Sequence, residues 1–155
     1  MMINLNEIMT RNLITLGPGD PVSRAGELMQ EHRIRHVPIV GEKNELLGLI
    51  TQRDILAAAS SSEKSGLASD IMREQVHTVS EDSDMRGAAL TMQKYKIGCL
   101  PVVNENKLVG IVTDSDYVSL AINLLEQLEM SDMDESDGFD EMDDFDDLLG
   151  DDDAL

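Results

Sequence analysis

A glycine, a threonine and an aspartate recur at one spacing in two places, as Gly48-x-x-Thr51-x-x-Asp54 and Gly110-x-x-Thr113-x-x-Asp116. In both copies an apolar run leads into the threonine, a residue that commonly begins a helix. The first turn of a helix offers unpaired N–H groups and the positive end of the helix dipole, which suit a phosphate. A carboxylate three residues later can accept hydrogen bonds from two adjacent hydroxyls, such as a ribose 2′,3′-diol. The pattern therefore predicts a nucleotide-like ligand.

The same residues also fit a helix cap. In a capping box the threonine hydroxyl accepts from an N–H three residues on, and an acidic side chain there accepts from the N–H of the threonine. Such boxes favour the longer Glu or Gln, whereas both copies carry Asp. From the residues alone both interpretations stay open, and one arrangement can serve both purposes. The glycine, placed in a strand, predicts that another group approaches the backbone closely.

The two copies are part of a longer internal repeat. When the chain is shifted by 63 residues, Ile8-Met9 falls on Ile71-Met72, and Val37-Pro38-Ile39-Val40 falls on Leu100-Pro101-Val102-Val103. Two repeats of ~60 residues are too few for an open solenoid, which needs three or more units. We therefore expect one domain with internal pseudo-two-fold symmetry, and paired repeats create paired clefts.

Each repeat is predicted to run β-α-β-β-α. The strands are expected over 13–16, 37–40 and 46–50, and again over 77–79, 99–103 and 107–112. Four helices are expected: one with Asp20 as N-cap and Pro21 at the first helical position, one from Thr51 to about Ala59, one over 84–95, and one from Thr113 to at least Leu125. A helix between the first two strands indicates parallel pairing, and a short loop between the last two indicates antiparallel pairing. The expected fold class is α+β.

Helical spacing also predicts which side chains face inward. In the first repeat the inward face includes Ala25, Met29 and His32, and in the second it includes Met92 and Tyr95.

Taken in order, these motifs resemble a cystathionine-β-synthase (CBS) domain pair, also called a Bateman module, over about residues 1–125. The resemblance implies two CBS repeats related by pseudo-two-fold symmetry, at 1–60 and 61–130. It implies a non-catalytic regulatory module that binds AMP, ADP, ATP or S-adenosylmethionine in clefts between the repeats and signals to a protein partner. It also implies a homodimer, which the apolar last helix with Ile122 and Leu125 supports.

The resemblance further assigns roles to single residues. Asp54 and Asp116 would hold ribose hydroxyls, and Thr51 and Thr113 would approach the phosphates. The base would be walled by residues that flank the proline strands: Ile14, Thr15, Val37 and Pro38 in the first repeat, and Thr78, Leu100 and Pro101 in the second.

Charge predicts that the two clefts differ. The first repeat carries Arg35, His36 and Arg53, which provide donors for a phosphate. The second has glycine and cysteine in place of Arg35 and His36, and it carries Asp114 next to its threonine. With the residues grouped by repeat, we expect a di- or triphosphate in the first cleft and repulsion of phosphate by Asp114 in the second. His36 is expected to make the affinity depend on pH.

The net charge of −19 is unevenly distributed. Residues 126–155 hold 15 of the 31 acidic side chains and no Lys or Arg, so residues 1–125 have a net charge of only −4. We expect residues 131–155 to form a disordered acidic tail. The alternative function is a protein-interaction module that acts through this tail, with vestigial nucleotide clefts.

Composition excludes several other classes of function. Strong negative charge argues against nonspecific binding to nucleic acid and to an anionic membrane surface. Cys99 is the only cysteine, so no intrachain disulfide forms, and no secretory leader or membrane-spanning apolar segment is visible. We expect a cytoplasmic protein. No metal-ligand spacing, Walker loop or nucleophile motif is present, so we expect no enzyme and no required cofactor.

Overall fold

The structure is a computed structural model that describes residues 4–60 and 66–134. Most of the expected acidic tail, from residue 135 onward, lies outside the described residues. The chain divides into two units, of which the first ends at Ser119 and the second begins at Leu120, within the last helix. No helix in the described part is long and apolar enough to cross a membrane.

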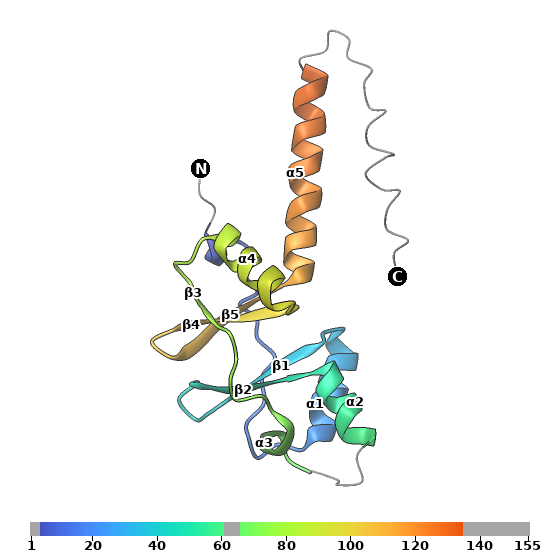
Figure 1. The fold of residues 1–155 in the computed structure, drawn as a ribbon, viewed down its shortest axis with the longest axis vertical. Coiled ribbons are helices and arrows are strands. Elements are labelled where there is room, and N and C mark those ends of the chain that lie inside the picture. Colours follow the sequence, from blue (N-terminus) through green and yellow to red (C-terminus); the bar gives the residue numbers. More distant parts are fainter. Residues whose placement is uncertain (1–3, 61–65, 135–155) are drawn as a thin grey trace. The chain divides into compact units, whose positions relative to one another are not determined.

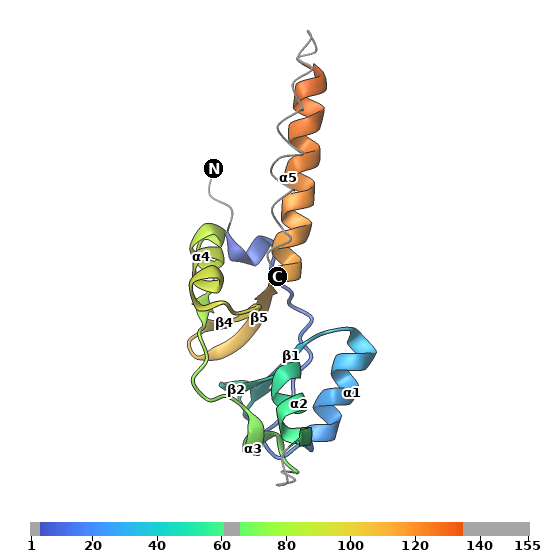
Figure 2. The same cartoon turned by 45° about the vertical axis from the view of Figure 1, so that its right-hand side comes forward.

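The first repeat is built on an antiparallel hairpin. After the short 3-10 helix η1 (Leu5–Glu7), its elements are α1 (Val22–His32), β1 (His36–Val40), β2 (Leu46–Thr51) and α2 (Gln52–Ser60). The helix α3 (Ala68–Ile71), which opens the second repeat, packs against α1, α2 and β2. β1 pairs with β2 from His36 opposite Thr51 to Val40 opposite Leu46. α1 and α2 lie side by side next to this hairpin (Figures 1 and 2).

The second repeat follows the same order. Its elements are β3 (Val79–Ser80), α4 (Met85–Tyr95), β4 (Cys99–Asn104), β5 (Lys107–Thr113) and α5 (Asp114–Asp134). β3 pairs in parallel with β4, and β4 pairs antiparallel with β5. The α+β fold class and the predicted pairing directions are confirmed.

Two elements at the beginning of the first repeat differ from the prediction. The strand expected over 13–16 is reduced to a single parallel bridge between Leu16 and Ile39. α1 begins at Val22 with Pro21, in extended conformation, as its N-cap, rather than with Asp20. The Asp20 carboxylate instead accepts a hydrogen bond from the N–H of Gly17 at 2.7 Å, so it stabilises the turn before the helix.

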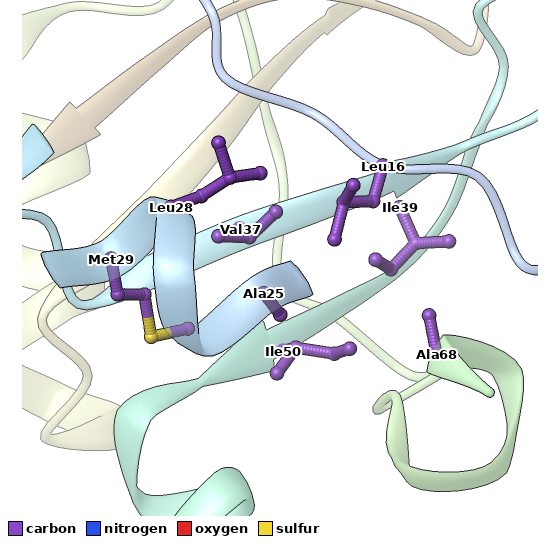
Figure 3. Close-up of a cluster of buried hydrophobic side chains, with 8 residues drawn as sticks. All are labelled: Leu16, Ala25, Leu28, Met29, Val37, Ile39, Ile50 and Ala68. Atoms are coloured by element: carbon purple, nitrogen blue, oxygen red, sulfur yellow. The ribbon is translucent and has the colours of Figure 1, made fainter. Parts of the chain in front are cut away.

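The core of the first repeat joins α1 to the hairpin. Ala25 and Met29 are buried as predicted, but His32 is exposed, and Leu28 completes the inward face. Figure 3 shows these side chains directed toward those of the strands and of α3. The cluster consists of Leu16, Ala25, Leu28, Met29, Val37, Ile39, Ile50 and Ala68. Tyr95, at the position that matches His32, is 47% exposed, so the inward prediction is wrong for both residues.

The tips of the two hairpins pair with each other through equivalent contacts. The N–H of Leu46 donates to the carbonyl of Asn106 at 3.2 Å, and the N–H of Leu108 donates to the carbonyl of Asn44 at 3.0 Å. Asn44 and Asn106 both have positive φ, at 63° and 67°. Asn44 is equivalent to Asn106 in the repeat, and Leu46 to Leu108, so each hydrogen bond is the symmetry equivalent of the other, as pseudo-two-fold symmetry requires.

A second pair of contacts crosses between the repeats at the two motif glycines. Met9, at the start of the first repeat, packs on Gly110 of the second, and Met72, at the start of the second repeat, packs on Gly48 of the first. Backbone bridges join Thr10 to Ile111 and Leu49 to Arg73 at the same places. The group that closely approaches each glycine is therefore a methionine segment of this chain.

We predict that Gly48→Ala destabilises the fold by about 1–3 kcal/mol, as overpacking does. A Cβ at residue 48 would lie 2.8 Å from the backbone carbonyl oxygen of Arg73, which a side-chain rotation cannot move. Urea denaturation measures the change. Gly26→Ala is the control, because a Cβ in that part of α1 meets nothing within 4 Å. It should leave the stability unchanged or raise it by up to about 1 kcal/mol, and equal stability of the two variants would contradict the prediction.

Candidate functional site

A cleft of about 190 Å³ lies between residues of the two repeats. We call it the Thr113 cleft. The first repeat lines it with Thr10, Asn12, Leu13, Ile14, Arg33, Ile34, Arg35, His36 and Pro38, and the second with Ile111, Thr113, Asp114 and Ser115. One wall is thus the segment before α1 together with the start of β1, and the other is the junction of β5 and α5.

At this junction the motif aspartate turns back toward its own threonine. The backbone N–H of Thr113 donates to Oδ2 of Asp116 at 2.8 Å, and the Thr113 hydroxyl lies 3.3 Å from the same oxygen. Oδ1 of Asp116 has no hydrogen bond or ion pair with any residue that the structure describes. One carboxylate oxygen therefore caps the helix, and the other remains available to an added hydroxyl group.

The equivalent carboxylate in the first repeat is fully engaged. Thr51 and Asp54 form a complete capping box, with Thr51 N–H donating to Asp54 Oδ2 at 2.9 Å and Asp54 N–H donating to the Thr51 hydroxyl at 3.3 Å. In addition, Arg73 Nε lies 3.0 Å from Oδ1 and 3.2 Å from Oδ2. Burial raises the pKa of Asp54, but the hydrogen bonds from Arg73 and Thr51 outweigh burial and hold this pKa below its ordinary value.

The structure groups the charges differently from the sequence analysis. Arg35 Nη2 of the first repeat lies 3.6 Å from Asp114 Oδ1 of the second. The grouping of cleft residues by repeat is therefore wrong, because the crossed backbone bridges bring the first repeat's start to β5. The cleft that contains Arg35 is also the cleft that contains Asp114.

The repeat spacing predicts a second, equivalent site, which we call the Thr51 cleft. Its residues are the equivalents of those lining the Thr113 cleft: Leu49, Thr51, Gln52, Arg53, Arg73, Gln75, Val76, His77, Lys96, Ile97, Gly98, Cys99 and Pro101. The bridge between Leu49 and Arg73 mirrors the bridge between Thr10 and Ile111, which supports this equivalence. From this equivalence we expect Arg53, Arg73 and Lys96 to share the Thr51 cleft and to make it the more cationic of the two.

His36 lies at the meeting point of the repeats. A Cβ on Gly98 would lie 3.5 Å from both Cε1 and Nε2 of the imidazole. Burial lowers the pKa of His36, and the neighbouring Arg35 charge lowers it further, against opposing effects of Asp114 and Asp54. The neutral form of the ring is therefore favoured.

The remaining predicted site residues are placed as follows. Ile14 and Pro38 line the Thr113 cleft, whereas Thr15 lines a separate hollow together with residues 16–18. Val37 and Leu100 are completely buried, so neither residue presents a surface to a ligand. Pro101 is also buried, and Thr78 and Arg53 are exposed.

Sequence reasoning missed Thr10 and Arg73, which directly follow the two Ile-Met pairs. Both residues follow a repeated Ile-Met pair, but their types differ between the repeats, so no shared motif marked them as site residues. His77 was also given no role, and its ring stacks on that of Tyr95 with centroids 4.0 Å apart.

Among known proteins, the chain matches relatives of two kinds. It is 36% identical over 131 residues to protein MK0525 of Methanopyrus kandleri, covering 82% of this chain and 67% of that protein. It is 37% identical over 123 residues to a homoserine O-acetyltransferase of Methanococcus vannielii, covering 77% of this chain but only 25% of the enzyme. The matched region thus also occurs as a small part of a longer enzyme.

Solved structures share the fold. A candidate acetoin utilization protein (AcuB) from Vibrio cholerae superposes with a TM-score of 0.78 at 46% identity, over 83% of this chain and 98% of that one. The CBS domain pair of protein MJ0100, in complex with 5′-methylthioadenosine and S-adenosyl-L-methionine, gives a TM-score of 0.74 at 32% identity, over 79% and 98%. CBSX2 in complex with AMP gives 0.71 at 25% identity, over 78% and 97%.

The sequence profile of the CBS domain matches the chain twice, at residues 5–61 and 68–123. These two matches contain both Gly-x-x-Thr-x-x-Asp motifs and all residues that line the Thr113 cleft. The chain therefore belongs to the CBS domain family and carries its domain as a tandem pair.

Proposed function

We propose that the chain is a non-catalytic regulatory module that binds an adenosine-containing ligand in clefts built from both repeats. The observation that carries this proposal is the free oxygen of Asp116, which belongs to the same first turn of α5 as Asp114 and Ser115 of the cleft wall. Two structural relatives, the MJ0100 domain pair and CBSX2, hold adenosyl compounds. AMP, ADP, ATP and S-adenosylmethionine are the candidate regulatory ligands.

In the Thr113 cleft the adenine ring would pack on apolar Ile14 and Pro38, and the ribose hydroxyls would donate to Asp116. The volume of about 190 Å³ is below the ~300–1,000 Å³ of pockets for drug-sized ligands. We therefore propose that the nucleoside part enters the cleft, while any 5′ substituent extends out of it.

The two clefts would differ in their preference for phosphate. In the Thr113 cleft, Asp114 Oδ1 accepts a hydrogen bond from the N–H of Ser115 at 2.8 Å and lies 3.6 Å from Arg35 Nη2. The Asp114 carboxylate therefore already engages this N–H and this guanidinium, which a phosphate would otherwise use. The Thr51 cleft has Gln52 in place of Asp114. We propose that a phosphorylated nucleotide prefers the Thr51 cleft and that a less anionic adenosyl group suits the Thr113 cleft. This keeps the assignment made from sequence at the two helix starts, although Arg35 and His36 belong to the Thr113 cleft.

We predict that Asp116→Ala lowers the affinity for adenosine or S-adenosylmethionine, whichever the wild type binds more tightly, by roughly 10- to 100-fold. A hydrogen bond to a charged group contributes about 1.5–3 kcal/mol, and about 1.4 kcal/mol corresponds to a factor of ten. Isothermal titration calorimetry gives the affinities. Asp84→Ala is the matched control, because it removes a carboxylate that caps a different helix, α4, none of whose residues lines the cleft. The proposed ribose contact is wrong if both variants bind like the wild type.

His36 gives a prediction for the stability of the ligand-free protein. Its folded-state pKa is lowered from 6.5, so between the two values the unfolded chain binds more protons than the folded one. This contribution to stability is complete above pH 6.5 and is lost as the pH falls toward the folded-state pKa. Urea denaturation between about pH 5 and pH 7 should show a smaller pH dependence for His36→Gln than for the wild type. His32→Gln, at an exposed histidine, should keep the wild-type dependence, and an unchanged slope in His36→Gln would refute the prediction.

We also propose that the chain acts as a homodimer and reports ligand binding to a protein partner that its structure does not identify. The support is apolar surface on α5, where Ile122, Leu125 and Leu128 are 51%, 49% and 62% exposed. Exposed apolar side chains in such numbers on one helix are typical of interaction surfaces.

For the dimer we predict a molar mass of twice the chain mass of 17.1 kDa in light scattering coupled to size exclusion. The double variant Ile122→Glu/Leu125→Glu should shift the mass to that of the monomer, because burying two carboxylates at an interface is unfavourable. Asn123→Glu adds charge at an exposed polar position of the same helix and should leave the dimer intact. A monomeric wild-type protein would exclude the homodimer.

A further inference from the structure

Both motif aspartates accept a hydrogen bond from the N–H of their own threonine, but only one of them has an arginine partner in the part of the chain that the structure describes. Asp54 accepts hydrogen bonds from Arg73 on both carboxylate oxygens, and Asp116 has no such partner among the described residues. The cause is a single position of the repeat, which holds Arg73 after Met72 and Thr10 after Met9. Thr10 is too short and carries no charge, so it cannot form the equivalent ion pair.

Arg73 is anchored where its side chain can reach the aspartate. Its N–H donates to the Leu49 carbonyl at 2.9 Å, and its own carbonyl accepts from the Leu49 N–H at 3.0 Å. From this fixed backbone the guanidinium approaches Oδ1 of Asp54 with Nε and Nη2, both at 3.0 Å. The Asp54 side chain is only 13% exposed, whereas that of Arg73 is 60% exposed. The guanidinium therefore covers the carboxylate from the solvent side.

Resting on the proposed role of Asp54 in binding ribose, we propose that Arg73 makes the Thr51 cleft selective for phosphorylated nucleosides. A ribose that binds Asp54 must displace the guanidinium from at least part of the carboxylate. An unphosphorylated nucleoside offers Arg73 no replacement for the lost ion pair. A 5′-phosphate offers one, because phosphate and carboxylate are both recognised by the two-pronged guanidinium.

The selectivity follows from an exchange of partners. Without ligand, Arg73 is held by Asp54, and with a nucleotide the sugar takes the carboxylate while Arg73 turns to the phosphate. Because the Arg73 side chain is largely exposed to solvent, it can make this movement without disturbing the packing of its neighbours. In the Thr113 cleft no arginine blocks Asp116, so an uncharged adenosyl group meets no such competitor there.

A purely structural ion pair predicts a different behaviour. An ion pair with one partner exposed to water contributes little to stability, and its loss would change the affinities of all ligands of the cleft in the same proportion. The selective exchange predicts changes of opposite sign for adenosine and AMP. The ratio of the two affinities therefore distinguishes the two roles.

The experiment uses the full chain with one cleft disabled. In the Asp116→Ala background, calorimetry with adenosine and with AMP reports on the Thr51 cleft, before and after Arg73→Gln. We expect Arg73→Gln to strengthen adenosine binding, to weaken AMP binding, and to reduce the preference for AMP at least tenfold. Arg73→Lys keeps the charge but loses the paired geometry, so its preference should be intermediate.

A converse variant introduces the arginine–aspartate pair into the Thr113 cleft. In the Asp54→Ala background, Thr10→Arg places an arginine at the equivalent position and should weaken adenosine relative to AMP in the Thr113 cleft. An unchanged ratio in both Arg73→Gln and Thr10→Arg would overturn the inference.

A readout without ligand separates this inference from the proposed function. Carbon-13 NMR of the Asp54 carboxyl should show that Arg73→Gln raises the Asp54 pKa, because the guanidinium that stabilises the charged form is gone. If this pKa rises and ligands bind but the ratio stays constant, the selectivity is wrong and the proposed function stands. If neither adenosine nor AMP binds to any variant, both proposals are contradicted.

Discussion

Two methionine side chains packed on two glycines hold the repeats in a crossed arrangement. Met9 occupies the space above Gly110, and Met72 the space above Gly48, with backbone bridges beside both contacts. A Cβ on Gly48 would come within 3 Å of the backbone carbonyl oxygen of Arg73, whereas a Cβ on Gly110 would meet the side chain of Met9, which would have to move. The crossing brings the start of each repeat to the last strand of the other, and so determines which residues share a cleft.

The crossing also decides the electrostatics. The Thr113 cleft joins arginines of the first repeat to Asp114 of the second, so positive and negative charge partly cancel there. At the equivalent helix start of the first repeat, the motif carboxylate Asp54 is already paired with Arg73. The duplicated sequence thus places different charges at two equivalent helix starts.

The sequence predicted the repeat, the fold class and most elements, because hydrophobic periodicity and the proline strands are local signals. It also predicted both helix caps, since Thr and Asp act on their own first turn. It failed where the outcome depends on long-range packing. Grouping Arg35 with Thr51 was wrong because spacing along the chain does not reveal that β5 receives the segment around Thr10. The left-handed residues Arg33 and Lys96, which end α1 and α4, were missed because neither is a glycine or an asparagine.

The central claim is that each ligand site is composed of both repeats, and a crystal structure with bound AMP tests it most directly. The account predicts the nucleotide in the Thr51 cleft, with its sugar at Asp54, its base beside residues of the second repeat, and Arg73 turned from the carboxylate to the phosphate. A nucleotide bound by residues of one repeat alone would contradict it. So would clefts that contain only solvent at saturating AMP, with both aspartates still bound only as in the free protein.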